Sequence, residues 1–140
     1  MTTLTKQSGS ANEKNVDQLF NDIREWNEKL LTTSEKITFL SQFVSADIFQ
    51  SELPHLDEQL STFSNALTIL KTEKIELHQL ISNHKNDING MLECEDISCE
   101  SFYYSEHKKL EIRLLNFFKD FAEYQTELFK YCTNKLRLSN

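Results

Sequence analysis

The sequence predicts an all-α fold: an elongated molecule of two to three long amphipathic helices that form coiled-coil rods. Its 140 residues include only two glycines and one proline, so tight turns are few and the elements between them are long. Apolar residues recur at heptad spacing through most of the chain. A helix from Pro54 to Asn89 would be about 54 Å long, whereas a compact domain of this size has a radius of gyration of about 14 Å. We therefore expect one elongated helical domain.

The chain begins with a polar stretch, residues 1–13, which is rich in Thr, Ser and Lys and predicts a disordered tail. The helical domain then spans 14–140, and its first helix is expected at 14–52. Thr32 followed by Glu35 fits a capping box, which would allow a break, but the heptad phase continues across it and favours one helix. The a and d positions of this helix are Val16, Leu19, Ile23, Trp26, Leu30, Thr33, Ile37, Leu40 and Val44.

A second helix is expected at 54–89, because Pro54 has no N–H to donate and suits a first turn. Gly90 is expected to close this helix in the left-handed conformation. Lys74 and His84 are polar residues in the apolar stripe, and His84, at a d position, is a candidate for fixing the register as a buried Asn does in coiled coils. The apolar stripe itself consists of Leu56, Leu60, Phe63, Leu67, Leu70, Leu77, Ile81, Ile88 and Met91.

An acidic loop is expected at 91–100, followed by a third helix at 101–138. The stripe of this helix is aromatic as well as aliphatic. Phe118, Phe129 and Cys132 widen it beyond a strict seam, so the helix should touch more than one neighbour and offers surface to a partner. Its central a and d positions are Leu110, Leu114, Phe117, Phe121, Tyr124 and Leu128.

The three cysteines, Cys94, Cys99 and Cys132, are an odd number in a chain that shows no signal peptide and no apolar run long enough to span a membrane. This pattern favours reduced thiols in a cytoplasmic protein, without disulfides.

The net charge of −7 opposes binding to nucleic acid, and it allows peripheral membrane association at most. No phosphate-binding glycine loop, nucleophile elbow or zinc-protease motif occurs, and the four histidines show no i, i+4 pair on a helix. Cys94 and Cys99 lack a second pair at zinc-ligand spacing. We therefore expect no enzyme activity, no cofactor and no metal site.

One stretch resembles a known family. The pattern of Val44, Ile48 and Leu53-Pro54-x-Leu56, leading into the long striped helix with Leu67 and Leu77, is similar to the core of pallidin, a subunit of the biogenesis of lysosome-related organelles complex. Further on, Phe102 and Tyr104, the run from His107 to Leu110 and a long last helix match the layout of pallidin's second half, but the basic terminal extension of the family is missing.

The resemblance implies a small coiled-coil subunit that packs with other short coiled-coil subunits in endosomal sorting, with a syntaxin-type SNARE as a further partner. It also implies peripheral placement on endosomal membranes.

The function that we expect is that of a non-catalytic scaffold subunit of a hetero-oligomeric complex in endosomal and lysosome-related organelle trafficking. The residues expected to form the seam with partner chains are Leu56, Leu60, Phe63, Leu67, Leu70, Leu77, Ile81, Ile88, Leu110, Leu114, Phe117, Phe121, Tyr124 and Leu128. Three alternatives stay open: a subunit of a kinetochore or spindle complex, a membrane-curving helical dimer, and a homodimer with no other partner.

Overall fold

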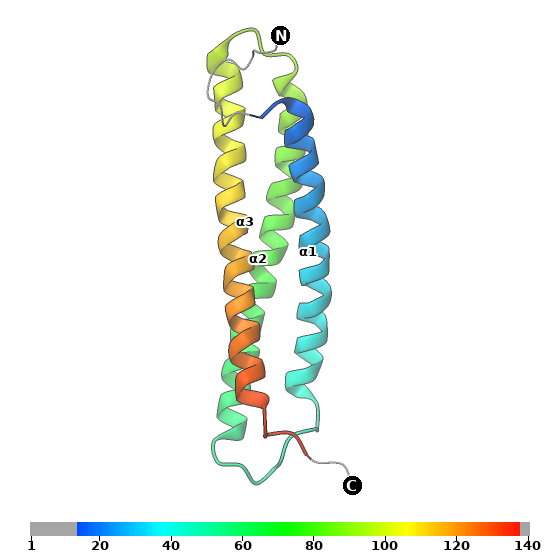
Figure 1. The fold of residues 1–140 in the computed structure, drawn as a ribbon, viewed down its shortest axis with the longest axis vertical. Coiled ribbons are helices and arrows are strands. Elements are labelled where there is room, and N and C mark those ends of the chain that lie inside the picture. The colour runs from blue at the N-terminus through cyan, green and yellow to red at the C-terminus, as the bar shows by residue number, and fades with distance from the viewer. Residues whose placement is uncertain (1–13, 138–140) are drawn as a thin grey trace.

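Three long helices, joined by short connections, make up the computed structural model, which describes residues 14–137. They are α1 (Val16–Ser45), α2 (Leu56–Met91) and α3 (Ile97–Cys132). α1 and α3 run in the same direction and α2 runs in the opposite one, so that the molecule is a rod of three side-by-side helices (Figure 1). The predicted elongated all-α fold is confirmed. The predicted tail, 1–13, lies outside the described residues.

The core is a single row of apolar layers along the rod. The heptad stripes of all three helices meet there, and the largest side chains with no more than 2% exposure include Leu30, Leu77 and Phe117. Burial of each such side chain stabilises the bundle by about 1.5–3 kcal/mol before the entropy of ordering is subtracted. Within residues 14–137 no helix is both long enough and apolar enough to cross a membrane.

α1 is one continuous helix. It begins with a capping box, in which the Asn15 side chain accepts from the Gln18 backbone and the Gln18 side chain accepts from the Asn15 backbone. No break occurs at Thr32, whose hydroxyl donates to the Glu28 carbonyl within the helix. The buried Thr33 occupies a core position, so the heptad phase is kept and the continuous reading is confirmed.

The predicted end of the first helix at 52 is wrong, because α1 ends at Ser45. The connection that follows, 46–55, is extended around Phe49 and pairs with the chain after α3. Phe49 forms an antiparallel bridge with Leu136, and the Gln50 and Arg137 amides donate to Lys135 and Ile48 carbonyls at 2.9 and 2.8 Å. For the same reason α3 ends at Cys132 rather than at 138. We refer to this end of the molecule, where the 46–55 connection meets the chain after α3, as the base of the rod. The backbone groups of the two segments form hydrogen bonds with each other there instead of continuing the helices.

The connection between α2 and α3 also differs from the prediction. Gly90 does not end the helix in the left-handed region; it lies within α2, where a Cβ atom would come 3.0 Å from the Tyr103 hydroxyl. The glycine therefore permits a close approach of α3. α3 starts at Ile97 rather than 101, because the Asp96 side chain caps it by accepting from the Cys99 amide at 2.8 Å.

Cys94 and Cys99 form a disulfide, with their Cα atoms 5.6 Å apart, so the expectation of three reduced thiols is wrong. Only Cys132 of the described cysteines is free, and it is buried. Because α3 starts at Ile97, Cys99 lies in the first turn of the helix, within reach of Cys94 in the connection. Spacing alone does not reveal this geometry.

Candidate interaction groove and buried histidine cluster

A polar cluster interrupts the apolar core at one layer, where each helix contributes one side chain. Asp22 comes from α1, His84 from α2 and His107 from α3. The Nε2 atom of His84 lies 2.8 Å from Nδ1 of His107, and Nε2 of His107 lies 2.9 Å from an Asp22 carboxylate oxygen. Both histidines are buried, at 6% and 4% exposure, so these bonds satisfy groups that water does not reach.

With both imidazoles neutral, the hydrogen bonds assign the protons. A carboxylate only accepts, so His107 Nε2 carries a proton and donates to Asp22. The other nitrogen of His107, Nδ1, carries no proton and accepts a hydrogen bond. The donor of that bond is the N–H group at Nε2 of His84. The chain of donors therefore runs from α2 through α3 to α1, with both imidazoles neutral.

The electrostatics agree with this proton pattern. Burial and, to a smaller extent, the neighbouring His107 lower the pKa of His84 to about 4, against the opposing effect of Asp87 and Glu106. Burial also lowers the pKa of His107, although its bond to Asp22 opposes the shift.

Asp22 stays ionised. Its partial burial alone would raise its pKa, but the hydrogen bonds from Lys14 and His107 outweigh burial and lower it.

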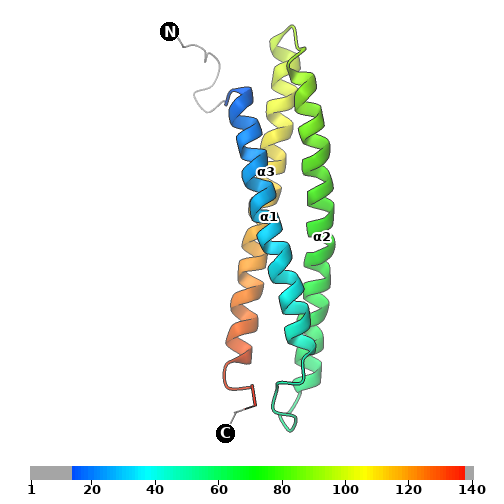
Figure 2. The same cartoon turned by 90° about the vertical axis from the view of Figure 1, so that its right-hand side faces the viewer.

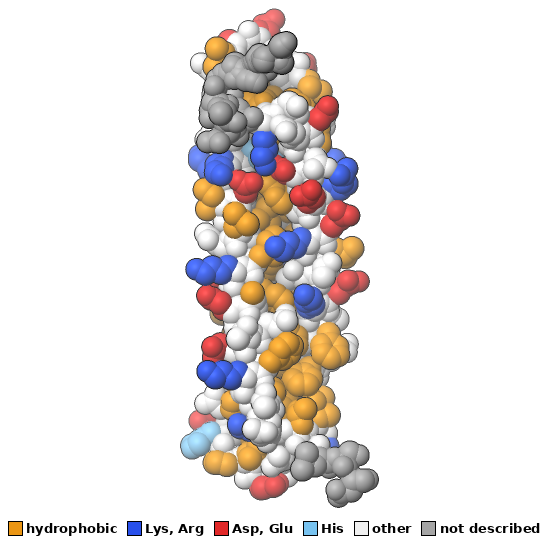
Figure 3. Space-filling view, viewed as in Figure 1, with side chains coloured by type: hydrophobic (Ala, Val, Ile, Leu, Met, Phe, Trp, Pro, Cys, Tyr) orange, Lys and Arg blue, Asp and Glu red, His pale blue; other side chains and the backbone are white. Residues whose placement is uncertain are grey.

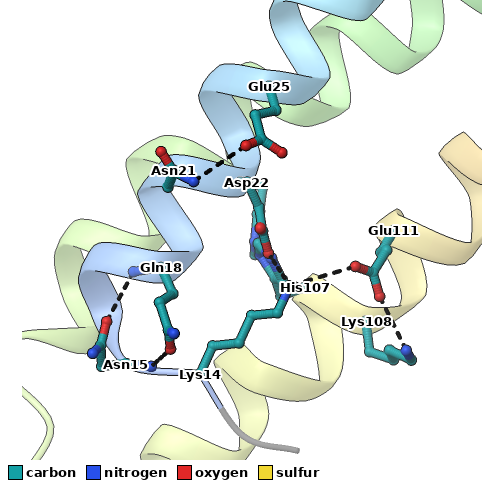
Figure 4. Close-up of polar contacts among 10 residues, drawn as sticks. Lys14, Asn15, Gln18, Asn21, Asp22, Glu25, His107, Lys108 and Glu111 are labelled. Carbon is teal, nitrogen blue, oxygen red and sulfur yellow. Dashed lines mark hydrogen bonds and ion pairs between the residues drawn. The ribbon is translucent and has the colours of Figure 1, made fainter.

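Two further groups enclose the cluster. Lys14 lies 2.6 Å from Asp22 and 3.7 Å from Glu111, and thus ties the start of α1 to α3 (Figure 4). The Trp26 ring stacks on His107 with 4.6 Å between ring centroids. No group of three or more His, Cys, Asp or Glu side chains in the described part of the chain is arranged to hold a metal ion. The cluster therefore links the three helices at one layer of the core.

The sequence predicts part of this cluster. His84 is a polar d position and a candidate for fixing the register, whereas His107 stands at an a position of α3, seven residues before Leu114, to which heptad spacing alone gives no such role. Asp22 lies just outside the a and d pattern of α1. The pairing of these residues depends on how three helices align, which heptad spacing within one helix does not determine.

The second feature is an open groove between α1 and α3. Both helices pack closely on α2 along their lengths, but they approach each other far less closely. The groove encloses about 460 Å³, within the range of ligand-binding clefts. It is lined by Thr32, Glu35, Lys36, Phe39, Leu40, Gln125 and Phe129.

The groove walls carry exposed aromatic side chains among polar ones. Phe39 of α1 is 61% exposed and Phe129 of α3 is 46% exposed, although both are large aromatic side chains. Phe39 stacks on Phe43, which meets the buried Phe49 edge-on, so an aromatic row leads from the groove to the base of the rod. In Figure 3 hydrophobic side chains gather on this face, over the lower part of α1 and between α1 and α3.

The α3 wall continues along the helix. Leu115, Phe118, Ala122, Gln125 and Phe129 follow one another at spacings of three and four residues, which places them on one face of a helix. Leu115 is 60% exposed, and Phe118 is half-buried beneath the Lys29 ammonium, which lies 4.5 Å from its ring centroid.

The residues predicted as a seam with partner chains pack inside this one chain. Twelve of the fourteen are buried, and Leu60 and Phe63 are half-buried against the same core. Tyr124 also donates a hydrogen bond to the Phe63 carbonyl at 2.9 Å, between α3 and α2. A role for these residues in partner binding stays a prediction, and it would require the bundle to open.

The fold and the groove together define the class of this protein: an elongated three-helix bundle with an open apolar face. Comparisons with family models, with curated proteins and with solved structures found no significant match.

Proposed function

We propose that this protein is a non-catalytic scaffold subunit that binds an amphipathic helix of a partner along the groove between α1 and α3. The observation that carries the proposal is the pair of exposed aromatic side chains, Phe39 and Phe129, on facing walls of this groove. Water-exposed aromatic side chains on both sides of a groove favour a helix that buries them. A fourth helix placed there would complete a four-helix bundle.

Charges of both signs lie beside the groove. Glu35 and Lys36 line the α1 wall and Lys29 lies over Phe118, and none of the three forms an ion pair within the described residues. A partner helix with an apolar stripe against α3 and charged side chains of both signs along its edge toward α1 would complement this arrangement.

We further propose a cellular pathway for such a subunit. The resemblance of the region from Val44 to Leu56 to pallidin supports a complex with other small coiled-coil subunits in endosomal and lysosome-related organelle trafficking. In the structure this region is the end of α1, the connection and the start of α2. A kinetochore or spindle complex is the alternative, and the partners recovered from cells distinguish the two.

The test places charges in the groove without touching the core. The tagged double variant Phe39→Glu/Phe129→Glu is expressed in the native cells, and the proteins that co-purify with it are quantified by mass spectrometry. A matched control, Ile69→Glu/Ile75→Glu, places the same charges on exposed apolar positions of α2, which are 68% and 56% exposed.

We expect the groove variant to lose its coiled-coil partners at least tenfold, about 1.4 kcal/mol, and the control to keep them. Equal recovery with both variants would show that the groove is not the interface. Leu70→Glu/Leu77→Glu is a poorer test, because Leu77 is fully buried and its replacement by a carboxylate would unfold the bundle.

A further inference from the structure

The end of the rod that carries the α2–α3 connection is chemically unlike the rest of the molecule. We refer to residues 91–102 as the tip. The tip extends beyond the start of α1, as Figure 2 shows, because Lys14 at the start of α1 contacts Glu111, about 21 Å along α3 from Ile97.

More than half of the net charge of the chain lies in the tip. Residues 91–102 contain four acidic residues and neither Lys nor Arg. The tip therefore carries −4 of the net charge of −7. Among the described residues no ion pair neutralises Glu93, Glu95 or Glu100.

Large apolar side chains stand among these carboxylates. Leu92 is 65% exposed, Ile97 is 80% exposed and Phe102 is 58% exposed. A single exposed apolar residue is ordinary, but three within eleven residues at the end of a rod form an unusual surface. The Cys94–Cys99 disulfide and the Asp96 cap hold the backbone that presents them. The surface is therefore preorganised, which lowers the entropy lost on binding.

We propose that the tip is a docking site for a basic amphipathic helix of a partner protein. The apolar face of that helix would cover Leu92, Ile97 and Phe102, and its Lys and Arg side chains would pair with the carboxylates around them. Charge complementarity selects this occupant. An anionic membrane or the tip of a second copy would meet carboxylates of its own sign. This site is separate from the groove, whose α3 residues Gln125 and Phe129 lie near the opposite end of that helix.

The test uses the full chain and a defined probe, a fluorescent amphipathic peptide of leucine and lysine of about five helical turns. Binding is measured by fluorescence anisotropy at low and physiological salt. One variant, Glu93→Gln/Glu95→Gln/Glu100→Gln, removes tip charge, and a second, Leu92→Ser/Ile97→Ser/Phe102→Ser, removes the apolar contacts. The matched control, Glu73→Gln/Glu123→Gln/Glu127→Gln, removes the same charge elsewhere on the rod. Circular dichroism checks that each variant is folded.

We expect the dissociation constant to rise at least tenfold for each tip variant and to stay within about twofold for the control. Binding should weaken with salt, and a leucine–glutamate peptide should not bind. Carbodiimide cross-links from peptide lysines should map to the tip carboxylates. Equal affinity of the charge variant and its control, or cross-links spread over the rod, would overturn the proposal, as would tip-dependent self-association or binding to anionic vesicles in place of the peptide. The groove variant should bind the peptide normally, so failure of this proposal leaves the proposed function testable.

Discussion

His84 shows how one buried side chain can control stability. Its neutral form donates a hydrogen bond to His107, and protonation would place a positive charge on a side chain that is buried in the core. The unfolded chain has no such restriction, and its histidines take up a proton near pH 6.5. The folded bundle should therefore be sensitive to acid through this residue.

The predicted acid sensitivity has a defined window. Because burial lowers the pKa of His84 to about 4, the unfolded chain binds a proton that the folded chain does not between pH 6.5 and 4. The free energy of unfolding should fall as the pH falls through this window, by about 3 kcal/mol at its lower end. Urea unfolding at a series of pH values measures this change.

Two variants isolate the contribution of His84 to the pH dependence of stability. Gln in His84→Gln can still donate to His107 but does not titrate, so the loss of stability toward pH 4 should shrink. His78→Gln changes an exposed histidine of the same helix and should leave the pH dependence as it is in the unmodified chain. If His84→Gln kept the full pH dependence, the source would lie in other groups.

At the scale of the elements, the disulfide joins the α2–α3 connection to the first turn of α3. It closes a loop with a sequence separation of 5, and the chain-entropy model assigns about 2 kcal/mol to a loop of this size. We expect Cys94→Ser/Cys99→Ser to unfold at lower urea, with a loss of about this size. Dithiothreitol should lower the free energy of unfolding of the unmodified chain by the same amount, and it should leave that of the variant unchanged.

A thiol count checks the same bond. In denaturant without reductant the chain should show one reactive thiol, that of Cys132. Three reactive thiols would contradict the disulfide, and they would agree with the expectation drawn from the sequence.

The sequence predicts the helices and their buried faces because both depend on a local period. Positions such as Leu19, Leu77 and Leu128 follow from heptad spacing, and all three are buried. The ends of the helices are less predictable. Ser45 ends α1 because the following chain bonds to residues near Leu136, more than 80 residues away. The groove likewise depends on the distance between α1 and α3, and the residue pattern within one helix does not predict that distance.

For the whole molecule, the closed core has a direct consequence for association. The side chains of the heptad stripes are buried within one chain, including the fully buried Leu77, Ile81 and Phe117. We expect the purified protein to be a folded monomer of 16.5 kDa that sediments more slowly than a compact sphere of this mass. Sedimentation velocity and circular dichroism over a range of concentrations measure both properties. A dimer whose dissociation abolishes helicity would show instead that the core is shared between chains.

The parallel course of α1 and α3 determines how the rod would respond to tension. The described chain enters the bundle toward one end of the rod and leaves it at the other, after the bridge between Phe49 and Leu136 (Figures 1 and 2). A force between these two points acts along the helix axes, so the helices would have to slide past one another. All layers of the core would then resist together, whereas a hairpin pulled at one end opens layer by layer.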